Sequence, residues 1–273
     1  HMAGRVAGRV ALVTGGAMGL GKADCEALAR EGAKVIVTDR DAELAHQVAA
    51  AIGGDAMALD VTNEEQWIEV MRAVKERHGG LDILVNNAGN VIFESIEECS
   101  LAHFRLHLDI HVVGTFLGCK YAVPLMKHRH LKIGGGGSSI INMASTAALM
   151  GYGNIPAYAA CKAGIAGMTR SLAIDFQDKG YGIRVNAISA GPIKTLAASG
   201  IGDFRYILKW NELNSPLRRN VTQEEVGKAS LYLLSDLGSG TTGENLHVDA
   251  GYHVVGMKAV DAPDIDVVTG RKE

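Results

Sequence analysis

The sequence contains only four cysteines, and their positions exclude two classes of small stapled domain. Cys25, Cys99, Cys119 and Cys161 lie far apart among 273 residues, and none of them shows Cys-x-x-Cys spacing. Widely spaced cysteines are typical of reduced thiols and argue against both a disulfide framework and a zinc knot.

Long apolar runs and a strong excess of one charge are also absent. No run of apolar residues approaches the ~18 that a membrane-spanning helix needs, and no charged and then apolar leader follows His1-Met2. The 27 basic and 30 acidic residues leave a net charge of −3, which is no footprint for nucleic acid. We therefore expect a cytoplasmic protein that binds neither nucleic acid nor a membrane.

Glycine and aliphatic side chains, in contrast, are abundant. Hydrophobic residues make up 47% of the chain, which excludes disorder, and the 34 glycines follow no three-residue period, which excludes collagen. A single α/β domain can reach ~250 residues. Because no linker, repeat or shift of composition divides the chain, we predict one domain over residues 1–273.

Short apolar runs alternate with helical patterns. The predicted strands cover residues 10–13, 35–37, 56–59, 82–85, 139–143, 183–188 and 245–248. The predicted helices cover residues 20–30, 64–77, 101–127 with a potential break at Pro124, 156–179 and 223–235. This alternation predicts an α/β fold with a Rossmann-type, doubly wound, seven-stranded parallel sheet flanked by helices. Two segments fall outside it, an irregular insertion at about 195–219 near the substrate and a polar tail at 259–273.

A glycine-rich turn follows the first predicted strand. Thr14-Gly15, Gly19 and Gly21 have the spacing of a dinucleotide-binding loop. Glycines let backbone N–H groups approach a pyrophosphate, and the following helix presents its positive N-terminus. Glycine turns without a ligand are common, so the interpretation depends on the position of this turn between a strand and a helix.

Asp39, at the end of the second predicted strand, indicates the choice of dinucleotide. A carboxylate there accepts hydrogen bonds from both ribose hydroxyls and repels a 2′-phosphate. The repulsion is on the order of 4 kcal/mol per unit charge at ~4 Å and an effective dielectric near 20. Arg40 would offset part of it, and a solvated turn residue is the alternative for Asp39. We expect NAD rather than NADP.

Ser145, Tyr158 and Lys162 form a second constellation. Ser145 follows the fifth predicted strand, and Tyr158 and Lys162 are one helical turn apart, so they share a helix face. Interconverting an alcohol and a ketone needs a proton donor beside the carbonyl, and a phenol of pKa ~10 must be lowered to about 7 to act as a base. An ammonium at ~4 Å supplies roughly the 4 kcal/mol required. A tyrosine and a lysine one turn apart also occur by chance.

Three histidines, His103, His107 and His111, recur every four residues in the helix predicted over 101–127. The spacing is compatible with metal ligands, but a metal site usually takes ligands from a second element and has ordered outer partners. Hydride transfer to a nicotinamide also needs no metal. We therefore predict no metal site and assign the histidines to helix packing or a subunit contact.

Together these motifs resemble the short-chain dehydrogenase/reductase family. The matching pieces follow the family's order over nearly the whole chain: residues 14–21, Asp60-Val61, residues 86–89, Ser145, Tyr158 with Lys162, and Asn186. The resemblance implies NAD(H) as cofactor, Tyr158 as general acid/base, and Lys162 as the residue that tunes Tyr158 and binds the nicotinamide ribose. Homotetramers are common in the family, so we expect one here.

The resemblance also implies a set of residues that contact the cofactor. They are Gly15, Met18, Gly19, Leu20, Gly21, Asp39, Asp60, Val61, Asn87, Ala88, Gly89, Tyr158, Lys162, Pro192, Ile193 and Thr195. Among them, Asp60 and Val61 would line the adenine site, and residues 87–89 would pass along the cofactor.

The chain departs from the family pattern at His111. The family usually carries an asparagine there, which anchors a water in a proton relay to the lysine. A histidine can also hydrogen-bond a water, but it is bulkier and titrates near pH 6.5. We include His111 with Ser145, Tyr158 and Lys162 in the expected catalytic set, and we expect it to alter the pH dependence.

The last third of the chain resembles a divergent branch of the same superfamily, the bacterial enoyl-acyl carrier protein reductases. Residues 189–199, 216–219 and 247–251 carry this second resemblance. Members of that branch reduce a carbon–carbon double bond, and six residues separate their catalytic tyrosine and lysine. Here three residues separate Tyr158 from Lys162, and Ile165 occupies the position that the other spacing requires.

Because chemistry follows the catalytic groups, we expect an NAD(H)-dependent oxidoreductase that interconverts a secondary alcohol and a ketone, a small-molecule substrate whose chain could be long or acyl-like. Three alternatives stay open: an NADH-dependent enoyl-thioester reductase, a catalytically weak natural or engineered hybrid of the two, and a non-catalytic nucleotide-binding protein.

Overall fold

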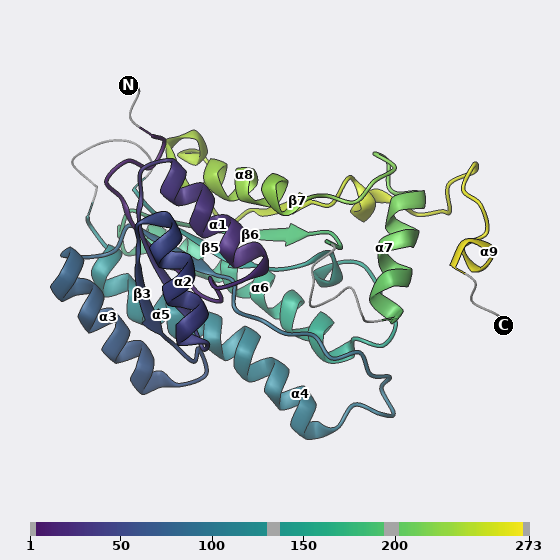
Figure 1. Ribbon diagram of the computed structural model, residues 1–273, viewed down its shortest axis with the longest axis horizontal. Helices are drawn as coiled ribbons and strands as arrows, with labels where there is room; N and C mark the ends of the chain where they lie inside the picture. Colours follow the sequence, from purple (N-terminus) through teal and green to yellow (C-terminus); the bar gives the residue numbers. More distant parts are fainter. Residues whose placement is uncertain (1–3, 130–136, 194–201, 270–273) are drawn as a thin grey trace.

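A parallel sheet, buried on both faces, forms the centre of the molecule (Figure 1). The computed structural model describes residues 4–129, 137–193 and 202–269. Within these ranges seven strands pair in the order β3-β2-β1-β4-β5-β6-β7. They are β1 (Val10–Val13), β2 (Lys34–Asp39), β3 (Asp55–Ala58), β4 (Ile83–Asn86), β5 (Ser138–Met143), β6 (Ile183–Ala190) and β7 (Asn245–Val248). The predicted seven-stranded, Rossmann-type parallel sheet is confirmed.

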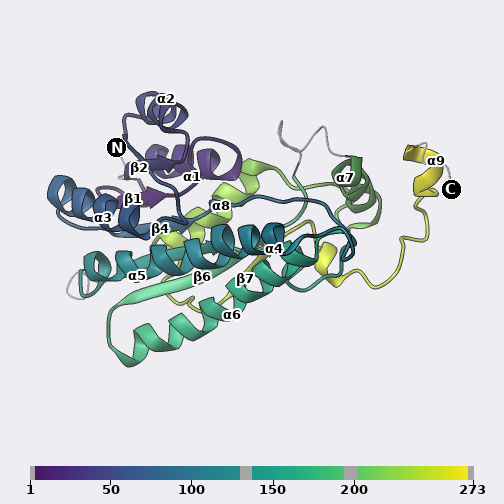
Figure 2. The ribbon, with the colours of Figure 1, turned by 90° about the horizontal axis from the view of Figure 1, so that it is seen from below.

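Helices cover both faces of this sheet (Figure 2). They are α1 (Gly19–Arg30), α2 (Ala42–Ile52), α3 (Glu64–His78), α4 (Leu101–His107), α5 (Gly114–Met126), α6 (Pro156–Asp178), α7 (Gly202–Asn214), α8 (Gln223–Leu234) and α9 (Ile265–Thr269). Side chains from α1, α2 and α8 form one hydrophobic core against the sheet, and side chains from α3, α5 and α6 form the other. Strands covered on both faces need apolar residues on both faces, which explains why β1 and β4 are buried throughout.

The strand order reverses beside β1, and this reversal locates the site. β1 pairs with β2 on one side and with β4 on the other, both in parallel. The loops that leave the carboxyl ends of β1 and β4 therefore diverge to opposite faces of the sheet and leave a crevice between them. In open α/β sheets such a crevice is where ligands bind.

Three helices were missing from the sequence prediction. α2 is capped at its start by Asp41, whose carboxylate accepts a hydrogen bond from Leu44 N–H, and at its end by Gly53 in the left-handed region (φ +68°). α7 lies inside the segment predicted to be irregular, and α9 lies in the predicted polar tail. These last two helices contact each other, and Ile265 of α9 is 5% exposed, so tertiary packing rather than local pattern accounts for them.

The helix predicted over residues 101–127 is continuous but not uniform. α4 passes into a π-helical segment, Leu108–Val113, which passes into α5. The potential break at Pro124 is absent, because Pro124 lies in the last turn of α5 and the helix ends two residues later. The irregularity falls instead at the segment that carries His111, and π-helical segments of this kind often occur at functional sites.

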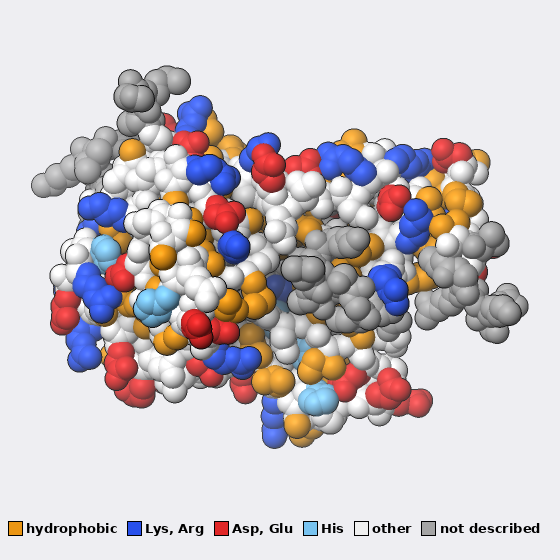
Figure 3. All heavy atoms as spheres, viewed as in Figure 1, with side chains coloured by type: hydrophobic (Ala, Val, Ile, Leu, Met, Phe, Trp, Pro, Cys, Tyr) orange, Lys and Arg blue, Asp and Glu red, His pale blue; other side chains and the backbone are white. Residues whose placement is uncertain are grey.

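The outer surface shows no field of one charge on the visible face. Acidic and basic side chains are interspersed over the face in Figure 3. None of the helices in the described ranges is long and apolar enough to cross a membrane.

Candidate active site

Hydrogen bonds tie the loop after β1 to the loop after β4. Thr14 Oγ1 accepts the backbone N–H groups of Asn87 and Ala88, each at 3.0 Å. The Asn87 side-chain amide donates in return to the carbonyls of Thr14 (3.2 Å) and Gly15 (3.3 Å). The two loops that border the crevice are therefore one hydrogen-bonded unit, and Thr14 was not among the predicted site residues.

The loop after β1 can exist only with glycine at several positions. Gly15 and Gly19 have φ of +59° and +57°, which side chains other than glycine rarely adopt. A Cβ on Gly21 would lie 2.2 Å from the Gly15 carbonyl oxygen. The first turn of α1 also receives no side-chain cap from Met18, so its N–H groups remain available to an anion. The cradle fits a pyrophosphate, as the sequence predicts.

Asp39 lies beside this loop at the end of β2. Its carboxylate accepts hydrogen bonds from Ala17 N–H (3.2 Å) and from Asp41 N–H (2.9 Å). These two bonds hold the carboxylate against the glycine loop, while each oxygen keeps a further acceptor position. The arrangement is what a ribose hydroxyl pair would require.

Asp60 and Val61 follow β3, the neighbour of β2. Thr62 donates to Asp60 Oδ1 from its backbone N–H (3.0 Å) and its hydroxyl (2.7 Å). Val61 is 8% exposed and faces Gly114, where an added Cβ would meet its side chain at 2.9 Å. Both residues thus lie at the same edge of the sheet as Asp39, on fixed supports.

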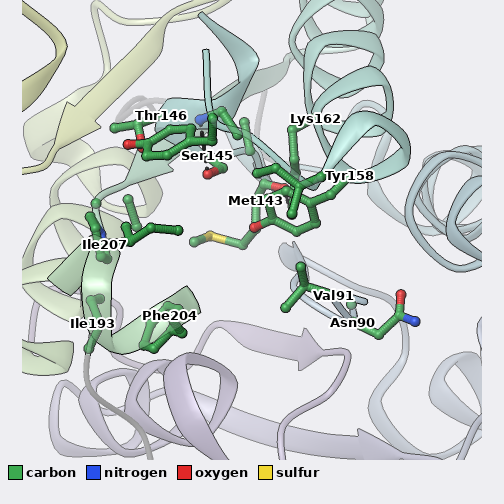
Figure 4. A pocket seen from close by; sticks show the side chains of 18 of the residues that line it. Asn90, Val91, Met143, Ser145, Thr146, Tyr158, Lys162, Ile193, Phe204 and Ile207 are labelled. Carbon is green, nitrogen blue, oxygen red and sulfur yellow. Dashed lines mark hydrogen bonds between the residues drawn. The ribbon is translucent and has the colours of Figure 1, made fainter. Parts of the chain in front are cut away.

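Ser145, Tyr158 and Lys162 come together at the carboxyl end of β5 (Figure 4). Ser145 caps a short 3₁₀ turn, Thr146–Ala148, by accepting Ala147 N–H at 3.1 Å, and its hydroxyl is close enough to Tyr158 to lower the pKa of the phenol. Lys162 Nζ lies 5.4 Å from the Tyr158 ring centre.

The electrostatics of this trio differ from the sequence expectation. Burial raises the pKa of Tyr158 above its usual value, and the Ser145 hydroxyl lowers it only in part. Burial also lowers the pKa of Lys162 to about 8, and the Lys162 ammonium donates to the Met143 carbonyl at 2.7 Å. The expected lowering of the Tyr158 pKa by Lys162 is not observed, because burial is the largest influence on this phenol and raises its pKa.

His111 lies edge-on to the Tyr158 ring, with 5.5 Å between ring centres. Its Nε2 lies 2.7 Å from the Asn90 carbonyl and 3.2 Å from the Asn90 N–H, and it can serve only one of them. The shorter contact favours a proton on Nε2 that is donated to the carbonyl. Nδ1 is then a bare acceptor, and it is buried with no partner within the described residues.

Burial and the nearby Lys162 charge lower the pKa of His111 to about 3. The expectation that His111 titrates near pH 6.5 is therefore wrong, since a 2% exposed imidazole beside an ammonium cannot easily accept a proton.

A cavity of about 500 Å³ lies above these groups. Of the predicted site residues, those on its wall are Leu20, Asn87, Gly89, His111, Ser145, Tyr158, Lys162, Pro192 and Ile193. The other predicted cofactor residues within the described ranges do not line this cavity. They lie in the glycine loop, at Ala88, and at the ends of β2 and β3. Thr195 lies outside the described residues.

The sequence prediction missed most of the apolar wall. The large side chains that it missed are Val91, Phe93, Tyr152, Ile155, Phe204 and Ile207. Only Phe204 and Ile207 carried a signal, because they fall within the segment predicted near the substrate. In Figure 4, Phe204, Ile207 and Ile193 lie across the cavity from Tyr158.

Asn186, which contributed to the resemblance, is not on the cavity wall. Its side chain donates to the Thr241 carbonyl at 3.0 Å and accepts Glu244 N–H at 3.0 Å. It therefore joins β6 to the segment that precedes β7. Within the described parts of the chain, no group of three His, Cys, Asp or Glu side chains is arranged to hold a metal ion.

Comparisons with known proteins agree with this geometry. A family profile described as enoyl-(acyl carrier protein) reductase matches residues 15–253. An enoyl-[acyl-carrier-protein] reductase [NADH] of Rhizobium meliloti is 43% identical over 259 residues, which cover 89% of each chain. A trans-4-hydroxycyclohexanecarboxylate dehydrogenase of Sinomonas cyclohexanicum is 39% identical over 258 residues, or 90% of this chain and 93% of that one.

A solved structure has the same fold. It is an enoyl-(acyl-carrier-protein) reductase of Anaplasma phagocytophilum in complex with NAD, which superposes with a TM-score of 0.83 at 34% identity. The match covers 96% of this chain and 98% of the other. The relatives thus include both enoyl-acyl carrier protein reductases and a hydroxycyclohexanecarboxylate dehydrogenase.

Proposed function

The chain belongs to the short-chain dehydrogenase/reductase family of oxidoreductases, and from this premise we propose that it interconverts a secondary alcohol and a ketone with NAD(H). The single observation that carries the proposal is the placement of Ser145 and Tyr158 together on the wall of the cavity beside the glycine loop, with Lys162 one helical turn from Tyr158.

The chain's own groups fit NAD(H) as the redox partner. The glycine cradle and the uncapped start of α1 would hold the pyrophosphate. Asp39 would bind the ribose hydroxyls and disfavour a 2′-phosphate. NAD(H), when bound, would supply or accept the hydride. NADH in the name of one relative and NAD in the solved neighbour support the same choice.

Proton transfer falls to Tyr158. Its raised pKa keeps the phenol protonated at neutral pH, so Tyr158 can donate a proton to the oxygen of a ketone that Ser145 holds by hydrogen bonding. Lys162, with a pKa of about 8, is a cation below that pH and would stabilise the phenolate that remains.

His111 would contribute by hydrogen bonding rather than by ionising. With a pKa of about 3 it is neutral throughout the working range, and its bare Nδ1 can accept a hydrogen bond from a water close to Lys162. A water held there would carry protons between Lys162 and solvent.

Enoyl-thioester reduction is the second candidate, and α7 favours it. Phe204 and Ile207 of α7 add apolar side chains to the cavity wall that suit an acyl chain, and two of the relatives are named enoyl-acyl carrier protein reductases. Against it, the lysine spacing of that branch falls on Ile165, which is 1% exposed and packs with Ala144 and Ala187 in the core. A catalytic lysine there would point into the sheet.

One assay separates these functions. We would incubate the protein and NADH with cyclohexanone, 2-octanone and crotonyl-coenzyme A and follow the loss of NADH absorbance. Turnover of a ketone supports the proposal, and turnover of crotonyl-coenzyme A alone refutes it. NADH binding without any turnover would indicate the non-catalytic alternative.

We also propose a homotetramer. Leu106, Val113 and Phe116, along the continuous helix 101–126, are large apolar side chains that are 36–49% exposed in the single chain. Association of copies would remove them from water. Light scattering after size-exclusion chromatography should give about four times the mass of one chain, and a monomer would refute this part of the proposal.

A further inference from the structure

The three histidines on the α4 side contact every second residue of the loop that follows β4. The contacts are His111 Nε2 with the Asn90 carbonyl (2.7 Å), His107 Nε2 with Ile92 N–H (3.2 Å), and His103 Nδ1 with the Glu94 carboxylate (2.7 Å). We name this set of three contacts the histidine ladder. It joins the helix at residues 103–111 to the loop at residues 90–94.

The four-residue spacing of the histidines matches the two-residue spacing of their partners in the loop for a geometric reason. Four residues of a helix advance by ~6 Å, and two residues of extended chain advance by ~6.6 Å. A loop that runs alongside the helix therefore meets one histidine with every second residue. The contacts of residues 90 and 92 are made by the backbone and that of residue 94 by its side chain, so the side chains of the two residues between the contacts remain available to the cavity.

Those intervening residues are Val91 and Phe93, and both line the cavity, as does Asn90 at the start of the loop. Figure 4 shows the side chains of Val91 and Asn90 leaving the loop in different directions, with the Asn90 amide turned away from Tyr158. The loop thus has one edge on the histidines and the other on the substrate space.

His107 shows how rigid the connection is. Its Nδ1 lies 2.8 Å from the His103 carbonyl, and because a carbonyl can only accept, Nδ1 carries the proton. Nε2 is then an acceptor, as the Ile92 N–H requires. The ring is 1% exposed, so one buried neutral imidazole connects helix and loop with both of its nitrogens.

The far end of the loop is attached to the catalytic helix. Glu94 N–H donates to the Asn154 carbonyl at 2.8 Å, just before α6 begins at Pro156. The loop is therefore held between the histidine-bearing helix and the helix that carries Tyr158.

We propose that His103, His107 and His111 are positioning residues: they fix residues 90–94 so that Val91 and Phe93 form a rigid apolar wall against the apolar part of the substrate. The inference rests on the proposed function for the identity of the substrate but not for the order of the loop. It gives the three histidines a role that needs no metal.

The first test measures the loop itself by hydrogen–deuterium exchange and needs no catalysis. His107→Phe keeps a flat ring but removes the acceptor for Ile92 N–H. We expect amide exchange in a peptide spanning residues 89–95 to rise at least tenfold. His107→Gln, whose carbonyl reaches about as far as Nε2, should restore exchange to within threefold of the wild type.

His46→Phe is the matched control. His46 on α2 makes the same Nδ1 contact to the carbonyl four residues earlier, at 2.7 Å, but it is exposed. If His107→Phe exchanges no faster at residues 89–95 than His46→Phe, the ladder does not order the loop and the proposal fails.

The second test measures the wall by kinetics. With cyclohexanol as the probe, His107→Phe should raise KM about tenfold, change kcat less than threefold, and leave the Kd for NADH unchanged. Phe93→Ala should raise KM to a similar extent while leaving the three histidine contacts intact. The wall can therefore still be tested if His107→Phe does not fold. An unchanged KM in both variants overturns the positioning role.

The two proposals fail in different ways. If the wild type reduces only crotonyl-coenzyme A, the proposed alcohol chemistry is refuted, and the same KM comparison is then made with that substrate. If the wild type oxidises cyclohexanol but the loop exchange is insensitive to His107, the chemistry stands and the ladder is refuted.

Discussion

The cofactor side and the substrate side of the crevice are built by different means. On the cofactor side, a single short segment, residues 14–21, supplies backbone N–H groups and Cβ-free surfaces, and one carboxylate, Asp39, supports it. On the substrate side, the wall comes from the loop at residues 90–94, from β5 and α6, and from α7. A site made of backbone depends on local residue type, whereas a site made of side chains depends on contacts between distant segments.

The largest effect should come from the group shared by both sides. Tyr158→Phe removes the proton donor but keeps the ring that packs against His111. We expect kcat for ketone reduction to fall by about 10²-fold or more, the usual scale for lost acid–base assistance, with an unchanged Kd for NADH. Steady-state kinetics and NADH fluorescence measure the two.

Tyr152→Phe is the control for that variant. Tyr152 lines the same cavity, but its hydroxyl bonds Thr146 at 2.8 Å rather than Ser145. We expect kcat to change less than tenfold. Equal losses in the two variants would remove the special role of Tyr158.

On the cofactor side, Asp39→Ala should narrow the preference for NAD over NADP about tenfold. A unit-charge repulsion of about 4 kcal/mol at ~4 Å is screened at a carboxylate that is partly exposed to water, and 1.4 kcal/mol corresponds to a tenfold change. The ratio of kcat/KM with the two coenzymes measures the effect.

Asp41→Ala provides the comparison for Asp39. It removes a nearby charge and the cap of α2, so it should lower stability by about 1 kcal/mol and leave the coenzyme ratio unchanged. If the NAD-to-NADP ratio of kcat/KM changed equally in both variants, the coenzyme preference would depend only on net charge near the site and not on the position of Asp39.

The pH dependence should come from Lys162 and not from His111. As pH rises through about 8, Lys162 loses its proton, so ketone reduction should fall by about tenfold per unit above that pH. His111, with a pKa of about 3, remains neutral from pH 5 to 9 and should produce no inflection near 6.5. A profile of kcat/KM from pH 5.5 to 9.5 tests both, and an inflection near 6.5 that His111→Asn abolishes would contradict the burial argument.

The smallest predicted effect is a loss of thermal stability at Gly89, where the cofactor side and the substrate side of the crevice meet. A Cβ on Gly89 would lie 2.6 Å from His111 Cε1, so Gly89→Ala must displace a buried ring. Overpacking of this kind costs roughly 1–3 kcal/mol, or a few degrees in Tm for each kcal/mol. Thermal unfolding followed by circular dichroism measures it.

Two further variants sharpen this result. Gly151→Ala, where the added Cβ meets nothing within 4 Å, should leave Tm unchanged. In a His111→Asn background the cost of Gly89→Ala should shrink, because asparagine is smaller than imidazole. Strictly additive effects would show that Gly89 and His111 do not press on each other.

Most of the fold was predictable because its signals are local. Each of the seven predicted strands lies within about two residues of an observed one, since apolar runs bounded by turn residues are sufficient for a buried parallel strand. α2 could also have been predicted from the sequence, from Asp41 as its N-cap and Gly53 as its C-cap. α7 and α9 were not, because these helices pack against each other and their sequences carry no strong boundary signal.

The candidate site divides in the same way. The glycine loop, Asp39 and the Tyr158–Lys162 pair were predictable, since each is a pattern within a few residues. The role of the histidines was not. Their spacing showed that they share a helix face, but only the folded chain brings residues 90–94 alongside it. The shifted pKa values of His111 and Lys162 likewise follow from burial, which no local pattern encodes.

By itself, the sequence determined the order of strands and helices, the glycine cradle at the end of β1, and the residues available for proton transfer, because backbone freedom and helical spacing are properties of neighbouring residues. Only the tertiary structure decided which loop the histidines hold, which side chains enclose the substrate space, and which groups carry charge. Those outcomes depend on segments more than 10 residues apart, such as Ile92 with His107, and on the removal of water from groups that meet only after the chain has folded.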